Sequence, residues 1–420
     1  MSLSGTSENI ERRQRMKNMK MLFGLTILVL LVLISVPSFA QQVLKIGSFN
    51  ALTGPAASWG INIDKGIDLC VEDWNKKGGV TVKGEKYKIQ TIHEDDKYRG
   101  EEAVKAVNKL IFTDKVKFIV GPFSGPSILA VQPTTEANKV IMICNSFAGP
   151  ELLKDKPYTF RSVVPPIHSS PEFFKFIAKR HPSFKTCVTI APNNATGFAS
   201  AQADNDSCDV AGIKVAATEF FEVATQDFTP MLTRIIPFKA DFLLLAATSG
   251  GHTALIIKQA RELGYKGKFV NSANLSLDDV GPIAGYENVE GTLTYSISTE
   301  GLVSKGIKDV AAKFEAKFGT GKEAKIAFAV GGAWYSGPDI LLKGIEKADS
   351  LDPDKVRQGI ENLGTFEVVQ GKAYWGGQEY YGIKHQLFYP IPVNEVQNRK
   401  LITVGNIMPW EVPPAKKKWW

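Results

Sequence analysis

One strand-to-helix junction carries residue types that bind anions. The apolar run Val116–Val120 is typical of a buried strand, and Gly121-Pro122 ends it. A helix is then expected after the small residues of Ser124–Ser127. Such a junction presents free backbone N–H groups at the edge of a parallel sheet, where the helix dipole favours an anion. The alternative is an ordinary connection in which a serine only caps its helix, but similar junctions recur along the chain.

Residues arranged for catalysis are missing from the sequence. It lacks the glycine-rich nucleotide motifs, the G-x-S-x-G nucleophile motif and the H-E-x-x-H zinc motif. Its histidines lie far apart without ligand spacing, at His93, His168, His181, His252 and His385. What recurs instead is Ser, Thr, Gly and Asn at predicted strand ends, a pattern typical of proteins that hold a small solute unchanged. We therefore expect no enzyme activity, no cofactor and no metal.

Two smaller features leave alternatives open. The acidic cluster Glu94-Asp95-Asp96 follows a predicted strand, where carboxylates either bind Mg²⁺ or cap a helix and stay solvated. The cysteines have no CxxC or CxxH spacing and stand at Cys70, Cys144, Cys187 and Cys208. Cys187 and Cys208 fall on a predicted strand and the helix after it. In an oxidising compartment they either form a disulfide or remain buried thiols.

The elements that position these residues alternate along the chain. From Val43 onward, strand-like and helix-like segments follow one another at intervals of about 25–30 residues, which predicts βαβ units feeding a parallel sheet. Extended or hairpin-like segments predict crossings between two lobes at residues 160–166, 291–298 and 374–380. We therefore expect an α/β fold with two Rossmann-like lobes built on parallel-rich sheets. Lobe 1 is expected to comprise residues 43–162 plus 298–374, and lobe 2 residues 165–292 plus 380–412.

Residues 1–40 are expected to form a secretory signal peptide. Basic residues within Arg12–Lys20 precede the apolar run Met21–Ile34, and small residues follow up to Ala40. We expect cleavage before Gln41 and a soluble product in the periplasm. The alternative is an uncleaved anchor, although the run is short for a bilayer span of about 20 residues. Cleavage removes five basic and two acidic residues and lowers the formal charge from +7 to +4, an excess too small to indicate nucleic-acid binding.

Short segments in a fixed order resemble the periplasmic leucine/isoleucine/valine-binding proteins of ABC importers. The resemblance covers residues 43–390. It rests on Leu52–Gly60, Trp74–Gly79, Ala103–Leu110, Val120–Ser124, Pro150–Leu152, Phe160-Arg161, Asp227-Phe228 and Lys258–Arg261. It implies a type I periplasmic binding fold, in which two α/β lobes close around a solute at the carboxyl ends of both sheets. It also implies a membrane permease as the partner.

The resemblance further implies a set of ligand-binding positions. Trp59 matches the tryptophan that lines the side-chain pocket, and the serine that holds the ligand carboxylate falls at Gly125, beside Ser124. The remaining positions fall at Ser146 and Ala148 around Phe147, at Thr196, at Ser249 or Gly250, and at Ala273. Ala273 stands where the resemblance places the acid that pairs with a ligand ammonium, so this chain departs from the pattern there.

That departure bears on the solute. An ammonium enclosed without a counter-charge costs several kcal/mol, whereas helix N-termini still hold a carboxylate. Aromatic residues near the junctions suit an apolar body, at Trp59, Phe123, Phe147 and Phe198. We expect a solute-binding protein for a small carboxylate. The solute is either an apolar or aromatic carboxylate or a branched-chain amino acid. An amino acid would require that the alignment is shifted by a few residues, or that Glu94, Asp95 or Glu222 supplies the counter-charge. A periplasmic sensor component and an exported α/β enzyme are the alternatives.

Overall fold

The computed structural model describes residues 10–23, 42–54, 56–147, 149–273, 275–295, 300–301 and 303–412. The chain divides into two units, Met1–Gln42 and Val43–Trp420. In the first unit, residues 10–23 are helical and exposed. Most of the expected signal peptide, including Ala40, lies outside the described residues. Within the described ranges, no helix combines the length and the apolar character that crossing a bilayer requires.

Parallel strands form the centre of the first sheet, where β1 pairs with β4, β4 with β5, and β5 with β6. The described strands follow the order β13-β14-β15-β6-β5-β4-β1-β3-β2. Their bounds, in that order, are Thr365–Val368, Gly371–Gly376, Gln386–Phe388, Thr159–Arg161, Ile141–Cys144, Phe118–Val120, Gln42–Asn50, Glu85–Asp95 and Val80–Val82.

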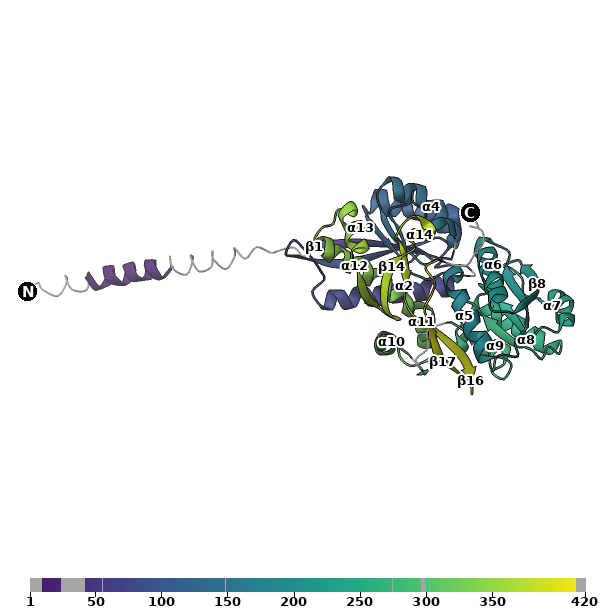
Figure 1. The fold of residues 1–420 in the computed structure, drawn as a ribbon. Coiled ribbons are helices and arrows are strands. Elements are labelled where there is room, and N and C mark those ends of the chain that lie inside the picture. Colours follow the sequence, from purple (N-terminus) through teal and green to yellow (C-terminus); the bar gives the residue numbers. More distant parts are fainter. Residues whose placement is uncertain are drawn as a thin grey trace, which may run out of the picture. The chain divides into compact units, whose positions relative to one another are not determined.

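Helices cover both faces of this sheet (Figure 1). Successive residues of β4 show why, because side chains along a strand point to opposite faces. Phe118 and Val120 pack with α2 (Ala57–Lys76) and α12 (Ser336–Ala348). Ile119 packs with α3 (Gly100–Asn108) and α4 (Gly125–Ala137) on the other face. Continuous apolar strands of this kind are typical of parallel sheets buried on both sides.

The second sheet repeats this arrangement. Its described strands follow the order β12-β17-β16-β11-β10-β9-β7-β8, and β11, β10, β9, β7 and β8 are parallel. Their bounds, in sheet order, are Glu300–Gly301, Lys400–Ile407, Ile391–Gln397, Leu293–Thr294, Lys268–Asn271, Phe242–Leu245, Thr186–Pro192 and Lys214–Phe221.

Alternate residues of β9 again pack on two layers. Leu243 and Leu245 contact the cluster of α7, α8 and α9, whereas Phe242 and Leu244 pack with α5 and α6. These helices span Pro166–Arg180 (α5), Ala195–Val210 (α6), Thr229–Ile235 (α7), Gly250–Glu262 (α8) and Leu277–Ala284 (α9). The remaining helical segments are η1 (Lys109–Thr113), η2 (Gly149–Glu151), η3 (Ile236–Phe238), α10 (Lys305–Phe318), α11 (Lys322–Gly331), η4 (Gly332–Tyr335), α13 (Pro353–Glu361) and α14 (Gln378–Tyr381). The expected α/β fold with two parallel-rich sheets is confirmed.

The crossings between the sheets lie partly where the sequence predicts them. The chain leaves β6 and enters α5 at residues 162–165, within the predicted 160–166. The hairpin expected from Tyr374 to Tyr389 is present, because Tyr374 in β14 pairs with Phe388 in β15, but it stays in the first sheet, so the predicted crossing at 374–380 is misplaced. The chain crosses later, at residues 389–390. The predicted crossing at 291–298 is only partly described.

The division into lobes stays a prediction, and two strands fall in the sheet opposite to the one it implies. Strand β15 belongs to the first sheet and β12 to the second.

The structure distinguishes between the two alternatives for the cysteines, a disulfide or buried thiols. All four cysteines are buried free thiols, and the Sγ atoms of Cys187 and Cys208 are 3.9 Å apart.

Candidate ligand-binding site

A cavity of about 710 Å³ lies at the carboxyl ends of strands from both sheets. In the first sheet, Phe123 follows β4, Ser146 follows β5 and Ser162 follows β6. In the second sheet, Ser249 follows β9 and Ala273 follows β10. Ligands bind at this edge in parallel α/β sheets because the following helices begin there.

Four aromatic rings form a cluster on the first-sheet side of the cavity. Phe123 lies at its centre, with ring centroids 6.1 Å from Trp59, 5.3 Å from Tyr98 and 6.4 Å from Trp334. All four line the cavity. Stacked and edge-on rings at these distances form a rigid apolar surface that suits a flat or branched apolar group.

The backbones of two helices set the spacing within this aromatic cluster. Trp59 lies on α2, and Trp334 lies in η4, directly after α11. A Cβ placed on Gly66 of α2 would lie 2.1 Å from the carbonyl oxygen of Gly331 at the end of α11. Because neither glycine has a side chain, the helices approach to backbone contact and bring the two tryptophans to one wall.

Tyr98 is held by a strained loop. Lys97 and Tyr98 both have left-handed backbones, with φ of 51° and 60°, which side-chain-bearing residues adopt only when other contacts compensate. Asp95 accepts a hydrogen bond from the Lys97 N–H at 2.9 Å, and Asp96 accepts one from the Tyr98 N–H at 2.8 Å. Asp95 also accepts the Leu52 N–H at 2.9 Å. The acidic cluster predicted from sequence therefore contributes local loop contacts that place an aromatic ring.

Two helix starts form the second-sheet side. Asn194 caps α6, where its side chain accepts the Gly197 N–H at 2.9 Å, and Thr196 in the first turn lines the cavity. Ser249 caps α8 and accepts the His252 N–H at 3.4 Å. The first N–H groups of a helix have no intrahelical acceptor. This side is therefore polar and directional.

The charge of the cavity is mildly positive. Among its described lining residues there is no Asp or Glu, and Lys97 is the one lysine or arginine. His252 also lines it, but burial lowers the pKa of this imidazole despite its hydrogen bond to the Val223 carbonyl. Near pH 7 the histidine is neutral. The cavity thus suits a carboxylate and offers no described counter-charge to an ammonium.

The predicted binding residues separate into two groups. Those that line the cavity are Trp59, Ser146, Phe147, Thr196, Ser249 and Ala273. Ser124 and Gly125 do not line it: the buried Ser124 hydroxyl accepts the Ser127 N–H at 3.3 Å and so caps α4. Gly250 faces Asp279 instead, and Ala148 lies outside the described residues. A binding role for each of the ten stays a prediction.

The acids and the aromatic residue proposed as substitutes lie elsewhere. None of Glu94, Asp95 and Glu222 is among the described lining residues. Phe198 packs against Phe220 at 4.8 Å and is exposed. Sequence reasoning missed Tyr98 and Trp334. Tyr98 follows the end of β3, so the expectation that residues after strands line the site could have identified it. No local sequence signal identifies Trp334 as a cavity residue.

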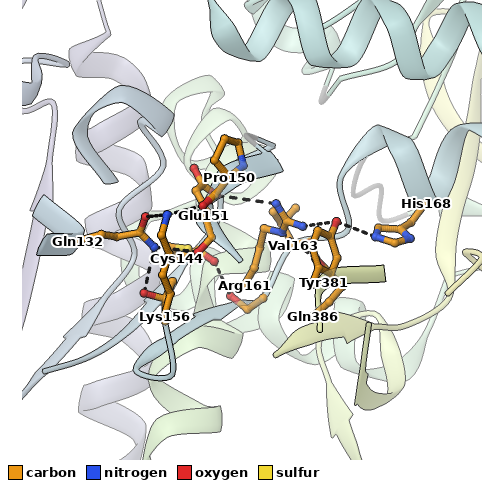
Figure 2. Close-up of polar contacts among 12 residues, drawn as sticks. Gln132, Cys144, Pro150, Glu151, Lys156, Arg161, Val163, His168, Tyr381 and Gln386 are labelled. Atoms are coloured by element: carbon orange, nitrogen blue, oxygen red, sulfur yellow. Dashed lines mark hydrogen bonds and ion pairs between the residues drawn. The ribbon is translucent and has the colours of Figure 1, made fainter. Parts of the chain in front are cut away.

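A buried polar network lies behind the cavity wall at the first crossing. Figure 2 shows Arg161 at its centre, next in sequence to the cavity residue Ser162. Arg161 donates to the Gln386 side chain at 2.7 Å and to the Tyr381 hydroxyl at 2.5 Å. Tyr381 in turn contacts Nε2 of His168 at 2.8 Å. The network therefore connects β6 with β15 and with α5, the elements next to the first and third crossings.

The ionisation of this network follows from burial. Burial and the nearby Arg161 lower the pKa of His168 to about 3, so the ring is neutral and its Nδ1–H donates to the Trp410 carbonyl at 2.6 Å. Glu151 lies 3.8 Å from Arg161, and both are fully buried. Burial raises the pKa of Glu151 to about 7, against the opposing effect of Arg161.

Comparisons with known proteins agree with this architecture. A family model described as "Periplasmic binding protein" matches residues 43–399. A leucine-, isoleucine-, valine-, threonine- and alanine-binding protein of Pseudomonas aeruginosa is 27% identical over 343 residues, covering 80% of this chain and 86% of the relative. A leucine-binding protein structure from Thermotoga maritima has a TM-score of 0.73 at 23% identity, covering 87% and 99% of the two chains. An ABC-transporter solute-binding protein from R. palustris, in complex with 4-hydroxybenzoate, has a TM-score of 0.72 at 22% identity, covering 89% and 98%. The chain belongs to the periplasmic binding protein family.

Proposed function

We propose that this chain captures a small carboxylate with an apolar or aromatic body and delivers it to the membrane permease of an ABC importer. The observation that carries the proposal is the cavity, which combines the aromatic cluster with helix starts and has no acid among its described lining residues. Burying an ammonium there would leave it without a counter-charge, at a cost of several kcal/mol. A carboxylate has no such penalty, because Lys97 and the first N–H groups of α6 can bind it.

Branched-chain amino acids are the second candidate class. The Pseudomonas aeruginosa relative is named for binding amino acids, and the R. palustris protein holds 4-hydroxybenzoate. Ala273 supports the carboxylate class, because its methyl group lines the cavity where the resemblance places an acid. Capture requires binding but no covalent step, which supports a solute-binding role over an enzyme, and a periplasmic sensor component stays the alternative to transport.

Calorimetry with matched ligands tests the proposal. Benzoate, 4-hydroxybenzoate and 4-methylpentanoate are compared with leucine, and any ligand that co-purifies is identified by mass spectrometry after denaturation. We expect at least one simple carboxylate to bind more tightly than leucine. Tight leucine binding with no response to the carboxylates would reject this class and favour amino-acid transport.

We further propose that residues 1–40 direct export and are removed before Gln41. The support is the order of basic, apolar and small residues in the sequence. N-terminal sequencing of protein recovered outside the cytoplasmic membrane tests this. An intact Met1 on a membrane-bound chain would contradict cleavage.

A further inference from the structure

Ser249 and His252 form a hydrogen-bonded pair at the second-sheet side of the cavity. Oγ of Ser249 lies 2.9 Å from Nδ1 of His252, and both residues line the cavity. The other ring nitrogen, Nε2, lies 3.0 Å from the carbonyl oxygen of Val223. Because a carbonyl oxygen only accepts, Nε2 must carry the ring proton.

This tautomer determines where the serine proton points. A neutral imidazole carries one N–H, so Nδ1 of His252 offers a lone pair. The Ser249 hydroxyl therefore donates to Nδ1. Its oxygen also accepts the backbone N–H of His252 at 3.4 Å, which leaves one lone pair of Oγ for a partner in the cavity.

Packing holds the imidazole in this orientation. The rings of Phe221 and Phe228 meet it edge-on, with centroids 4.8 Å and 6.0 Å away. Both phenylalanines are buried. Turning the ring would break the hydrogen bond to the Val223 carbonyl and disturb this contact. The Ser249 hydroxyl therefore keeps donating its proton to Nδ1 of His252.

A carboxylate already lies beside the start of α8. A Cβ placed on Gly250 would lie 2.3 Å from Oδ2 of Asp279. This side chain offsets the positive end of the helix dipole near Ser249. With the helix dipole offset there, a ligand carboxylate at the same end would face a serine that cannot donate, so it is better placed near Lys97 or α6.

We propose that Ser249 acts as an acceptor only, and that the solute must present a hydrogen-bond donor to this end of the cavity. The donor is a hydroxyl on an aromatic carboxylate or the ammonium of an amino acid. This inference rests on the proposed function and deepens it, because it assigns a chemical requirement within the same cavity. A solute without a donor leaves a polar oxygen unpaired, and an acceptor-only group faces a lone pair.

Calorimetry with two ligand pairs tests the requirement and distinguishes the two donors. 4-Hydroxybenzoate is paired with benzoate, with 4-methoxybenzoate as an acceptor-only control, and leucine is paired with 4-methylpentanoate, which lacks only the amino group. We expect the donor-bearing member of one pair to bind about tenfold more tightly than its partner. Preference within the first pair identifies a hydroxyl, and preference within the second identifies an ammonium.

Variants assign the preference to this residue pair. Ser249→Ala should bring the affinity ratio close to one. His252→Leu frees the serine proton and should reduce the ratio while improving 4-methoxybenzoate relative to benzoate. His252→Asn keeps an acceptor oxygen near the position of Nδ1 and should retain the preference; thermal unfolding checks that each variant folds.

The outcomes separate this inference from the proposed function. If carboxylates bind but show no donor preference, or if Ser249→Ala leaves the ratio unchanged, Ser249 is not the acceptor and the inference is wrong. If neither the carboxylates nor leucine bind, the proposed function fails and the inference fails with it.

Discussion

The two sides of the cavity differ in what they offer a solute. The first-sheet side presents mainly aromatic rings around Phe123, and the second-sheet side presents the capped starts of α6 and α8. Apolar burial is non-directional and rewards area, whereas hydrogen bonds reward position and polarity. We therefore expect the aromatic side to contribute mainly to affinity and the polar helix starts mainly to selectivity, so that mutations affect the two separately.

The largest effect is expected where the two sides are joined. Arg161→Leu removes the cation 3.8 Å from the buried Glu151. We expect a loss of about 3–5 kcal/mol in the free energy of unfolding, because the buried Glu151 carboxylate loses its pairing with Arg161. Urea denaturation at pH 8 measures it: the wild-type Glu151, with its pKa raised to about 7, is then mostly ionised, whereas the loss of Arg161 raises this pKa further, so the variant must bury an uncompensated charge or take up a proton. The double variant with Glu151→Leu should recover much of the loss, and a double variant no more stable than the single one would contradict this explanation.

The next largest effect tests the aromatic side. Phe123→Ala removes the central ring of the cluster and should weaken carboxylate binding by about 1–3 kcal/mol in calorimetry. Phe198→Ala is the matched control, because this ring pairs with Phe220 and is not among the described cavity residues. Equal losses in both variants would mean that the cluster has no special role.

Selectivity is tested on the polar side. Ala273→Glu places a carboxylate in the cavity and should weaken simple carboxylates through like-charge repulsion while strengthening α-amino acids. Each change is expected to be about 1–3 kcal/mol, the range for hydrogen bonds to charged groups. A thermal-shift screen of both ligand classes measures it. A uniform loss for both classes would indicate a steric effect rather than recognition of charge.

The two sheets should also respond to different pH ranges. On the first, burial lowers the pKa of His93, but hydrogen bonds to Asp64 and Asp68 outweigh it and raise the pKa to about 10. On the second, burial raises the pKa of Asp204 to about 7, although Ser170 and Ser272 oppose it. A raised folded pKa gives stability that is present below the unfolded pKa and is lost as pH rises.

Stability tied to His93 should therefore fall between pH 6.5 and about 10, and stability tied to Asp204 between pH 3.8 and about 7. Denaturation across both ranges, with His93→Gln and Asp204→Asn, separates them. Each variant should flatten the curve in its own range; if both flatten the same range, the assignment is wrong.

Strand-end reasoning predicted much of the fold and part of the site. The resemblance placed Ser146, Thr196 and Ser249 among the binding positions, and all three line the cavity because residues after parallel strands share one edge of a sheet; their binding role stays a prediction. Strand-end reasoning did not bring Ser124 to the cavity, because that hydroxyl caps its own helix. Trp334 could not be predicted in this way, because it reaches the cavity through the contact between α2 and α11, which depends on residues far apart in sequence. The third crossing was misplaced since a hairpin does not reveal which sheet it joins.

The contact between Gly66 and Gly331 bears on how such a protein diverges. Each glycine is closed to larger residues by the backbone of the opposite helix: a Cβ on Gly331 would lie 2.0 Å from the carbonyl oxygen of Asn62. Alanine at either position would push α2 and α11 apart and move Trp59 away from Trp334. The spacing between the two tryptophans is therefore fixed by Gly66 and Gly331, neither of which lines the cavity. Evolution or engineering toward a thicker solute thus has a route that widens the aromatic wall without substituting any residue that lines the cavity.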